Sequence, residues 1–290
     1  MISDMCMDPR LNELSIIIVT WKGDDLLRGC LDSLARAVGT APEIVVVDNA
    51  AEESTRSLVA EYPNATYVAS PGNPGFAGGN NIGLKKTTRD YILLLNNDTI
   101  IHADSFSPLI DFLDAHPKVG IVQGTMNVPV LNNGLDVCGE NLMPWGILQH
   151  RLHGKPTATT KLKATRVSAA KGAMLCLKRQ VVSDVGGRLF DPSFRNYFED
   201  IDLCLRAKNA GWETWFVPTP PIDHLCGRTT ARFSGDDIWA QYLRNILYSF
   251  HRNFGFWGHV FTIPCFFCAA LIRCPRALRK ALALLRAPAG

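Results

Sequence analysis

The stretch DYILLLNNDTII, residues Asp90–Ile101, decides the fold. The five consecutive apolar residues Tyr91–Leu95 are too few for a membrane span and too uniform for a half-exposed strand, so they predict a parallel-sheet strand buried on both faces. The strand ends on Asn96, Asn97 and Asp98. Because the carboxyl ends of parallel strands border the ligand crevice of an open α/β sheet, a carboxylate and two amides there suit a divalent cation. An Asx-rich turn that only ends the strand is the alternative.

Strand and helix patterns alternate from Leu14 to Leu95. Apolar, β-branched runs predict three further strands, and apolar residues at helical spacing predict the helices between them. This alternation indicates βαβ units, hence an α/β fold with a mostly parallel central sheet flanked by helices. The predicted strands are Leu14–Thr20, Glu43–Val47 and Ala65–Ala69, and the predicted helices are Asp24–Leu34, Glu52–Glu61 and Asn81–Thr88.

Composition excludes some classes of protein. At 290 residues the chain can bury one large core or two modest ones. A net charge of +3 is too small for a nucleic-acid binder, so no nucleic-acid partner is expected. Most of the nine cysteines lie in apolar segments without metal-ligand spacing, which predicts reduced thiols in a cytosolic compartment. The first residues have no apolar core of signal-peptide length, so we do not expect secretion.

Two features of the first half suit a nucleotide-like ligand. Asp48 closes a buried strand, as Asp98 does, so both carboxylates should face the same crevice. Asp48 could accept a base N–H or a ribose hydroxyl, or it could only cap the helix that begins near Glu52. The glycines between positions 71 and 84 would let the backbone approach phosphate or ribose oxygens. This segment is neither a Walker A loop nor a GxGxxG turn.

The second half contains the candidate catalytic acids. Residues 127–162 are polar and aperiodic, as expected of a segment that shapes a site. Glu199, Asp200 and Asp202 open a helix, where the helix dipole alone favours acids. Tyr197 and Phe198 place apolar surface beside them, and apolar walls can tune a carboxylate into a general base. His224, in a later loop, becomes a candidate metal ligand only if that loop returns to Asp98.

Seven segments together resemble family 2 of the glycosyltransferases, and within it the rhamnosyltransferase-like group of bacterial surface-polysaccharide enzymes. They are IIIVT, EIVVVDN, NPGFAGGNNIGL, YILLLNNDT, KGAMLCLKR, FDPSFRNYFEDIDLCLRAKNAGW and DHLCGRT, in the family's order between Leu14 and about Arg232. The resemblance implies a GT-A fold, a nucleoside-diphosphate sugar donor, a divalent metal (Mg²⁺ or Mn²⁺) and inversion at the anomeric carbon.

The resemblance also implies roles for residues on the donor side. Asn96-Asn97-Asp98 stands where the family has its D-x-D, so Asp98 would bind the metal together with His224, and Asn96 would touch ribose. Asp48 resembles the base-recognising aspartate. The other residues expected to contact the nucleotide sugar are Thr20, Trp21, Asn73, Gly75, Asn81 and Asn97. Trp21-Lys22 replaces the usual Tyr-Asn, and this departure lies near the expected base pocket.

On the acceptor side, Asp200 resembles the catalytic base. Glu199 is its neighbour in the acceptor site, and Gly172 and Trp212 are further expected acceptor contacts. The implied reaction is transfer of a sugar, with rhamnose a candidate, to a hydroxyl of a lipid-linked or polysaccharide acceptor in cell-surface glycan synthesis. A non-catalytic nucleotide-sugar-binding or scaffold protein on the same fold is the alternative, because fold alone does not establish activity.

The last part of the chain forms a second predicted unit. We expect a catalytic domain over residues 14–235 and a helical segment over residues 236–290. The apolar run Phe254–Ile272 is interrupted by Gly255, Gly258 and Pro264, and the bases that follow it have no acidic neighbours. This pattern predicts peripheral contact with the cytoplasmic face of the inner membrane. A helix packed on the catalytic domain or on a second subunit is the alternative, and the oligomeric state stays open.

Overall fold

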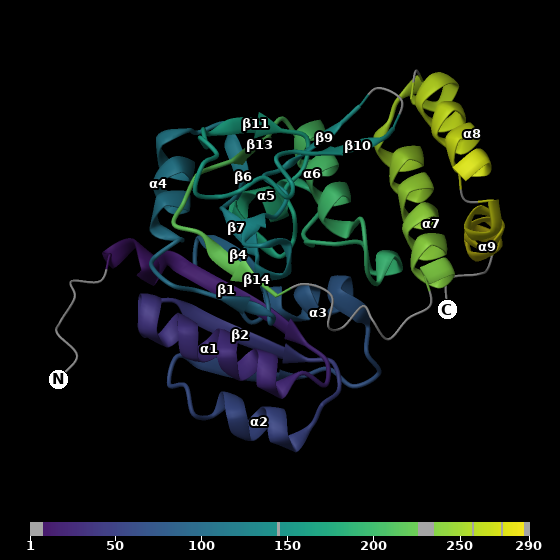
Figure 1. Ribbon diagram of the computed structural model, residues 1–290. Helices are drawn as coiled ribbons and strands as arrows, with labels where there is room; N and C mark the ends of the chain where they lie inside the picture. Colours follow the sequence, from purple (N-terminus) through teal and green to yellow (C-terminus); the bar gives the residue numbers. More distant parts are fainter. Residues whose placement is uncertain (1–7, 144–145, 226–234, 257, 274, 287–290) are drawn as a thin grey trace.

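The computed structural model describes residues 8–143, 146–225, 235–256, 258–273 and 275–286. Its centre is an eight-stranded sheet with the order β11-β13-β6-β12-β4-β1-β2-β3. Strands β1, β2, β3 and β4 are parallel, and β12 is antiparallel to both of its neighbours, β4 and β6. The predicted α/β class with a mostly parallel sheet is therefore confirmed, with helices on both sides (Figure 1).

The first half of the chain builds the parallel strands. The predicted central strand is β4, Tyr91–Asn96, which lies between β1 and β12 with residues 91–95 buried. The other elements are β1 (Leu14–Thr20), α1 (Asp24–Val38), β2 (Glu43–Asp48), α2 (Glu53–Val59), β3 (Ala65–Ala69) and α3 (Gly75–Leu84), after a short 3₁₀ helix η1 (Pro9–Glu13).

The glycine-rich segment after β3 differs from its prediction. It is helical from Gly75 onward, whereas the sequence predicts a helix only from Asn81. A Cβ atom on Gly79 would lie 2.7 Å from the Val19 side chain, and one on Gly83 would lie 2.5 Å from Ile17. Gly79 and Gly83 therefore allow α3 to pack closely on β1, a structural role that the sequence did not predict.

The second half completes the sheet and adds smaller ones. The antiparallel strand β12 (Met174–Lys178) inserts between β4 and β6, and the 127–162 segment contains short strands that periodicity does not reveal. The elements are β5 (Thr99–Ile100), α4 (Ser107–Ala115), β6 (Val119–Gln123), β7 (Met126–Val128), η2 (Pro129–Leu131), β8 (Gly134–Leu135), β9 (Glu140–Leu142), β10 (Leu148–His150), β11 (Thr165–Val167), α5 (Arg179–Asp184), η3 (Pro192–Phe194), α6 (Glu199–Asn209), β13 (Glu213–Phe216) and β14 (Ile222–His224).

Two apolar clusters cover the two faces of the sheet. Alternate residues of β1 point to opposite faces, so Ile16 and Ile18 join one cluster and Ile17 the other. Helices α1, α2 and α4 pack on the first face, and α3, α5, α6 and α7 pack on the second. A sheet buried on both faces explains the uninterrupted apolar run of β4.

The C-terminal segment is helical and packs on the α/β unit. It comprises α7 (Gly235–Asn253), the π-helical turn η5 (Gly258–Thr262), α8 (Ile263–Arg273) and α9 (Pro275–Arg286), which lie together beside α6 (Figure 1). Ala277, Leu278 and Ala281 of α9 share a buried cluster with Phe198 and with α7. Within the described ranges, no helix combines the length and apolar character that a bilayer crossing needs.

Candidate functional site

The carboxyl ends of the parallel strands and a later strand bring the predicted donor-side residues together. Strand β14 pairs with β5, which places His224 opposite Thr99, the residue after Asp98. As a result, His224 Nε2 lies 3.4 Å from Asp98 Oδ1 and 3.3 Å from Asn96 Nδ2. The condition set for His224, that its loop return to Asp98, is met in the structure.

A buried carboxylate orients His224. Asp136, whose side chain is 1% exposed, accepts a hydrogen bond from His224 Nδ1 (2.8 Å) and is bound through both oxygens by Lys171 Nζ (2.8 Å each). Burial would raise the pKa of Asp136, but the His224 hydrogen bond and the Lys171 charge outweigh it and hold this pKa below its usual range. Because an ionised carboxylate only accepts, Nδ1 carries the hydrogen of this bond, and Nε2 is the ring nitrogen that faces Asp98.

The environment of Asp98 fits a divalent cation. Asp98 Oδ1 is buried and makes no hydrogen bond in the described part of the chain, and it lies 3.4 Å from His224 Nε2. A buried carboxylate oxygen beside an imidazole nitrogen is satisfied by a cation held between the two atoms or by a shared proton. No three His, Cys, Asp or Glu side chains form a metal-binding group within the described residues, so a ligand would have to complete the coordination.

Asp200 lies at the first turn of α6 and is held by backbone amides. Its Oδ2 accepts a hydrogen bond from Gly172 N and its Oδ1 from Ile201 N, both at 2.8 Å. Burial and the charge of Glu140 raise the pKa of Asp200 to about 6, while these two amides oppose the rise. The structure thus joins Asp200 to Gly172, an expected acceptor contact, and gives Asp200 a pKa suited to a base near neutral pH.

The acids beside Asp200 lie in different environments. Glu199 is buried, and burial followed by the charge of Asp200 raises its pKa well above the usual range. Asp202 accepts hydrogen bonds from Arg206, Ser249 and Asn253, each at 2.8 Å. Asp202 therefore ties α6 to α7 and pairs with Arg206 one turn further along α6.

Several other predicted nucleotide contacts are engaged within the protein. The carboxylate of Asp48 accepts from Ala50 N (2.9 Å) and Glu52 N (2.7 Å), so it orders the turn into α2, which corresponds to the capping alternative. Asn81 uses both ends of its amide on the backbone of Phe190, at 2.7 and 3.0 Å. Asn97 Nδ2 donates to Thr20 Oγ1 at 3.0 Å, so these two residues lie side by side at the strand ends.

Three further predicted residues, Trp21, Asn73 and Gly75, contact neighbouring segments of the chain. Trp21 follows β1 directly, and the amine of Lys22 lies 5.8 Å from its ring centroid. Asn73 Oδ1 accepts from Gly75 N at 3.3 Å, and a Cβ atom on Gly75 would lie 2.5 Å from Arg195 O, so this turn packs against the segment that precedes α6.

Trp212 is the predicted acceptor contact that the structure does not bring to the site. It precedes β13, which runs parallel to β6, so it lies at the edge opposite the strands' carboxyl ends. Its Nε1 donates to Asp184 Oδ2 at 2.9 Å, and its ring packs against Gly120. Although Trp212 is close to the acidic motif in sequence, helix α6 separates the two in space.

Two contributors are absent from the sequence prediction. Lys171 belongs to the segment KGAMLCLKR but receives no role from the sequence, and Asp136 lies in the aperiodic segment. No local pattern distinguishes a buried ion pair that joins residues 35 positions apart. The one signal was an acid directly before the apolar pair Val137-Cys138.

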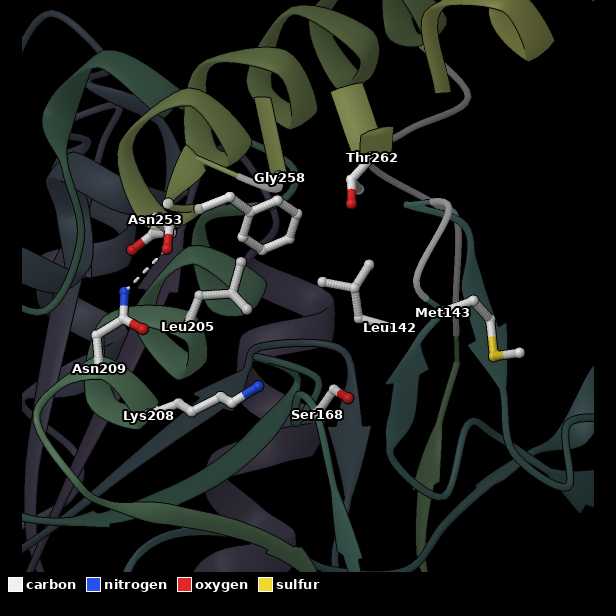
Figure 2. Close-up of a pocket in the computed structure, with 11 residues that line it drawn as sticks. Leu142, Met143, Ser168, Leu205, Lys208, Asn209, Asn253, Gly258 and Thr262 are labelled. Atoms are coloured by element: carbon white, nitrogen blue, oxygen red, sulfur yellow. Dashed lines mark hydrogen bonds between the residues drawn. The ribbon is translucent and has the colours of Figure 1, made fainter. Parts of the chain in front are cut away.

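A separate pocket lies away from this crevice. Its volume is about 340 Å³, and it is bounded by β9, the end of α6 and the junction of α7 with η5 (Figure 2). Leu205, Lys208 and Asn209 line it, and Asn209 Nδ2 donates to Asn253 O at 3.2 Å. Because α6 begins beside Asp200 and ends at Asn209, the pocket is at the end of the helix remote from Asp200.

The solved structures to which this chain is similar share its fold. The mannosyltransferase PcManGT from Pyrobaculum calidifontis, in complex with GDP-Man and Mn²⁺, superposes with a TM-score of 0.58 at 17% identity. The match covers 97% of this chain and 76% of that one. The predicted GT-A fold is therefore confirmed, with a central sheet that is mostly parallel.

Sequence comparisons agree with the fold. The low-salt glycan biosynthesis hexosyltransferase Agl10 of Haloferax volcanii is 27% identical over 203 residues, which is 68% of this chain and 62% of that protein. The N-acetylglucosaminyl-diphospho-decaprenol L-rhamnosyltransferase of Mycobacterium tuberculosis is 22% identical over 270 residues, 84% of this chain and 86% of that protein. A family model described as glycosyltransferase like family 2 matches residues 9–246. The chain belongs to this family.

Proposed function

We propose that the chain is an inverting, metal-dependent glycosyltransferase that moves a sugar from a nucleoside diphosphate to an acceptor hydroxyl. The observation that supports the proposal most strongly is that two consecutive residues, Lys171 and Gly172, each hold a different part of the site. Lys171 binds the carboxylate that orients His224, and Gly172 N binds Asp200. A candidate cation site and a candidate base are thereby supported from one short segment, as a single displacement at an anomeric carbon requires.

The residues have complementary tasks in such a displacement. Asp200 accepts the proton of the attacking hydroxyl, since the carboxylate form predominates above a pKa of about 6. Asp98 and His224 would hold the cation, with Asn96 beside them at ribose. A bound divalent cation would stabilise the negative charge that develops on the leaving diphosphate. The Mycobacterium relative is named a rhamnosyltransferase with a lipid-linked acceptor, which supports a deoxyhexose donor and a lipid-linked or polysaccharide acceptor here.

The metal assignment predicts that Asp98→Asn and His224→Ala each weaken Mn²⁺ binding by about tenfold or more, since each removes a direct ligand. Titration calorimetry of the protein with Mn²⁺, with and without a nucleoside diphosphate, measures the affinity. His102→Ala is the matched control, because His102 is exposed and pairs with Asp223 at 2.8 Å on the same small sheet. An unchanged affinity in His224→Ala would remove His224 from the site.

The base assignment predicts that Asp200→Asn loses about 10²–10⁴ in turnover while donor affinity barely changes, because the amide keeps the shape and cannot take a proton. Wild-type turnover should rise with pH through about 6 and then level off, since the ionised fraction of Asp200 rises there. The residual turnover of Asp200→Asn should not show this rise with pH.

Two neighbouring acids serve as controls for that experiment. Asp202→Asn should lower the free energy of unfolding by about 1.5–3 kcal/mol, through the hydrogen bonds to Arg206, Ser249 and Asn253, with little effect on turnover per folded molecule. If Glu199→Gln is inactive and Asp200→Asn is not, the base is Glu199. If both stay active, the non-catalytic binding protein is the better account.

We also propose that η5 and α8 contact the cytoplasmic face of a membrane. The side chains of Phe256, Val260, Phe261 and Leu271 are exposed here, and Phe256 is 72% exposed. Residues 238–290 contain seven arginines and lysines and no acid, a charge balance that suits anionic lipid headgroups. The packing of α9 on α7 leaves this surface available, so a packed tail and membrane contact are compatible.

The membrane proposal predicts that the double variant Phe256→Ser/Phe261→Ser loses most binding to vesicles that contain anionic phospholipid, because it removes exposed apolar area without touching the core. Added salt should weaken wild-type binding. The control is Val130→Ser, which alters an apolar side chain that is 77% exposed on η2. Cosedimentation measures binding. If the wild-type protein stays in the supernatant at low salt, the proposal is wrong.

A further inference from the structure

Two buried carboxylate oxygens near Asp200 have no partner in the described part of the chain. They are Oε2 of Glu140 and Oε2 of Glu199, whose residues are 8% and 6% exposed. A buried acceptor that makes no hydrogen bond is costly, and the cost is removed when a ligand supplies a donor. Glu199 is already expected at the acceptor site. Nothing described so far gives Glu140 a role there.

Backbone pairing places Glu140 beside the segment that holds Asp200. Glu140 N donates to Ala169 O (2.9 Å), and Ala169 N donates to Glu140 O (3.0 Å), three residues before Gly172. The Glu140 charge adds to burial in raising the pKa of both Asp200 and Tyr242 of α7. The backbone pairing therefore places Glu140 of β9 near the loop whose Gly172 N binds Asp200.

A histidine across the hairpin fixes the orientation of this carboxylate. His150 is the partner of Glu140 in the β9–β10 register, and its Nδ1 lies 2.9 Å from Glu140 Oε1. The hydrogen bond to Glu140 raises the pKa of His150. One oxygen is thus occupied while Oε2 remains an acceptor, which selects a hydroxyl or N–H donor.

Helix α7 contributes aromatic surface that packs against the residue before α6, since Phe198 and Tyr242 meet edge-on with ring centroids 5.8 Å apart. Trp239 is exposed and meets Tyr242 edge-on, with ring centroids 5.8 Å apart. An exposed indole offers an apolar face, and a sugar ring has both an apolar face and a rim of hydroxyls. Aromatic surface beside an ordered carboxylate acceptor suits a sugar better than an isolated alcohol.

We propose that Glu140, oriented by His150, determines acceptor specificity by accepting a hydrogen bond from a second hydroxyl or N–H of the acceptor sugar, next to the hydroxyl that Asp200 deprotonates. The proposal rests on the proposed function, because it uses that function's acceptor site. It assigns the acceptor to the class of sugars with at least two donor groups on one side of the ring. Simple lipid alcohols lack the second donor.

The test measures binding, so it does not depend on turnover. Wild-type protein with Mn²⁺ and a nucleoside diphosphate is titrated with a panel of octyl hexosides and octyl N-acetylhexosaminides, followed by the monodeoxy forms of the tightest binder. One deoxy form should bind about 10- to 100-fold more weakly than its parent, the range for a hydrogen bond to a charged group. Glu140→Gln should bind the parent glycoside as weakly as the wild-type protein binds that deoxy form. This variant should also bind the parent and the deoxy form with equal affinity.

Two further variants keep the test specific. His150→Ala, which alters a half-exposed side chain, should weaken the discrimination between parent and deoxy form by releasing the Glu140 carboxylate. Glu213→Gln is the control, because the Glu213 carboxylate is already engaged by Arg166 (3.0 Å) and by Trp215 Nε1 (2.9 Å), so this change should leave the discrimination intact.

The outcomes separate this inference from the proposed function. If wild-type protein binds no glycoside, or if Glu140→Gln keeps the discrimination, the inference is wrong. If the binding pattern holds and no donor is ever transferred, the specificity site stands and the transferase proposal fails.

Discussion

The buried ion pair between Lys171 and Asp136 is the interaction on which the site depends. A carboxylate with 1% exposure must be paired, and the lysine amine meets both of its oxygens at 2.8 Å. Asp136 then fixes the hydrogen on His224 Nδ1 and turns Nε2 toward Asp98. The next amide in the chain, Gly172 N, holds Asp200. Because one dipeptide anchors both halves, a change that displaces Lys171 should disturb both together.

Glu199 and Asp200 show how neighbouring carboxylates acquire different chemistry. Both are buried near other acids, which raises the pKa of each. Two backbone amides donate to Asp200 and limit its rise to about 6, whereas Oε2 of Glu199 makes no hydrogen bond in the described part of the chain. Asp200 can therefore lose its proton near neutral pH, and Glu199 favours its protonated form. The loop that supplies Gly172 N, rather than the acidic motif alone, distinguishes Asp200 from Glu199 as the candidate base.

The parts of the fold with local periodicity were predictable from sequence, and those that depend on long-range pairing were not. The apolar run of β4 and the alternation from β1 onward predicted the parallel sheet, because burial on both faces leaves a clear sequence pattern. The glycines of α3 were misread as a loop, since their purpose is contact with β1. Motifs alone select Asp98, Asp200 and His224 as candidates, but Asp136 and Glu140 lie in a segment whose short strands have no period. Trp212 was misplaced because α6 separates it from Asp200.

The central claim is that a cation binds between Asp98 and His224 while Asp200 stands across the crevice from it. The most direct measurement is the anomalous diffraction of Mn²⁺ in crystals grown with a nucleoside diphosphate. We expect one peak at coordination distance, about 2.0–2.4 Å, from a carboxylate oxygen of Asp98 and from His224 Nε2, with diphosphate oxygens completing the shell. A peak that lies away from His224, or a diphosphate bound elsewhere on the molecule, would contradict the account.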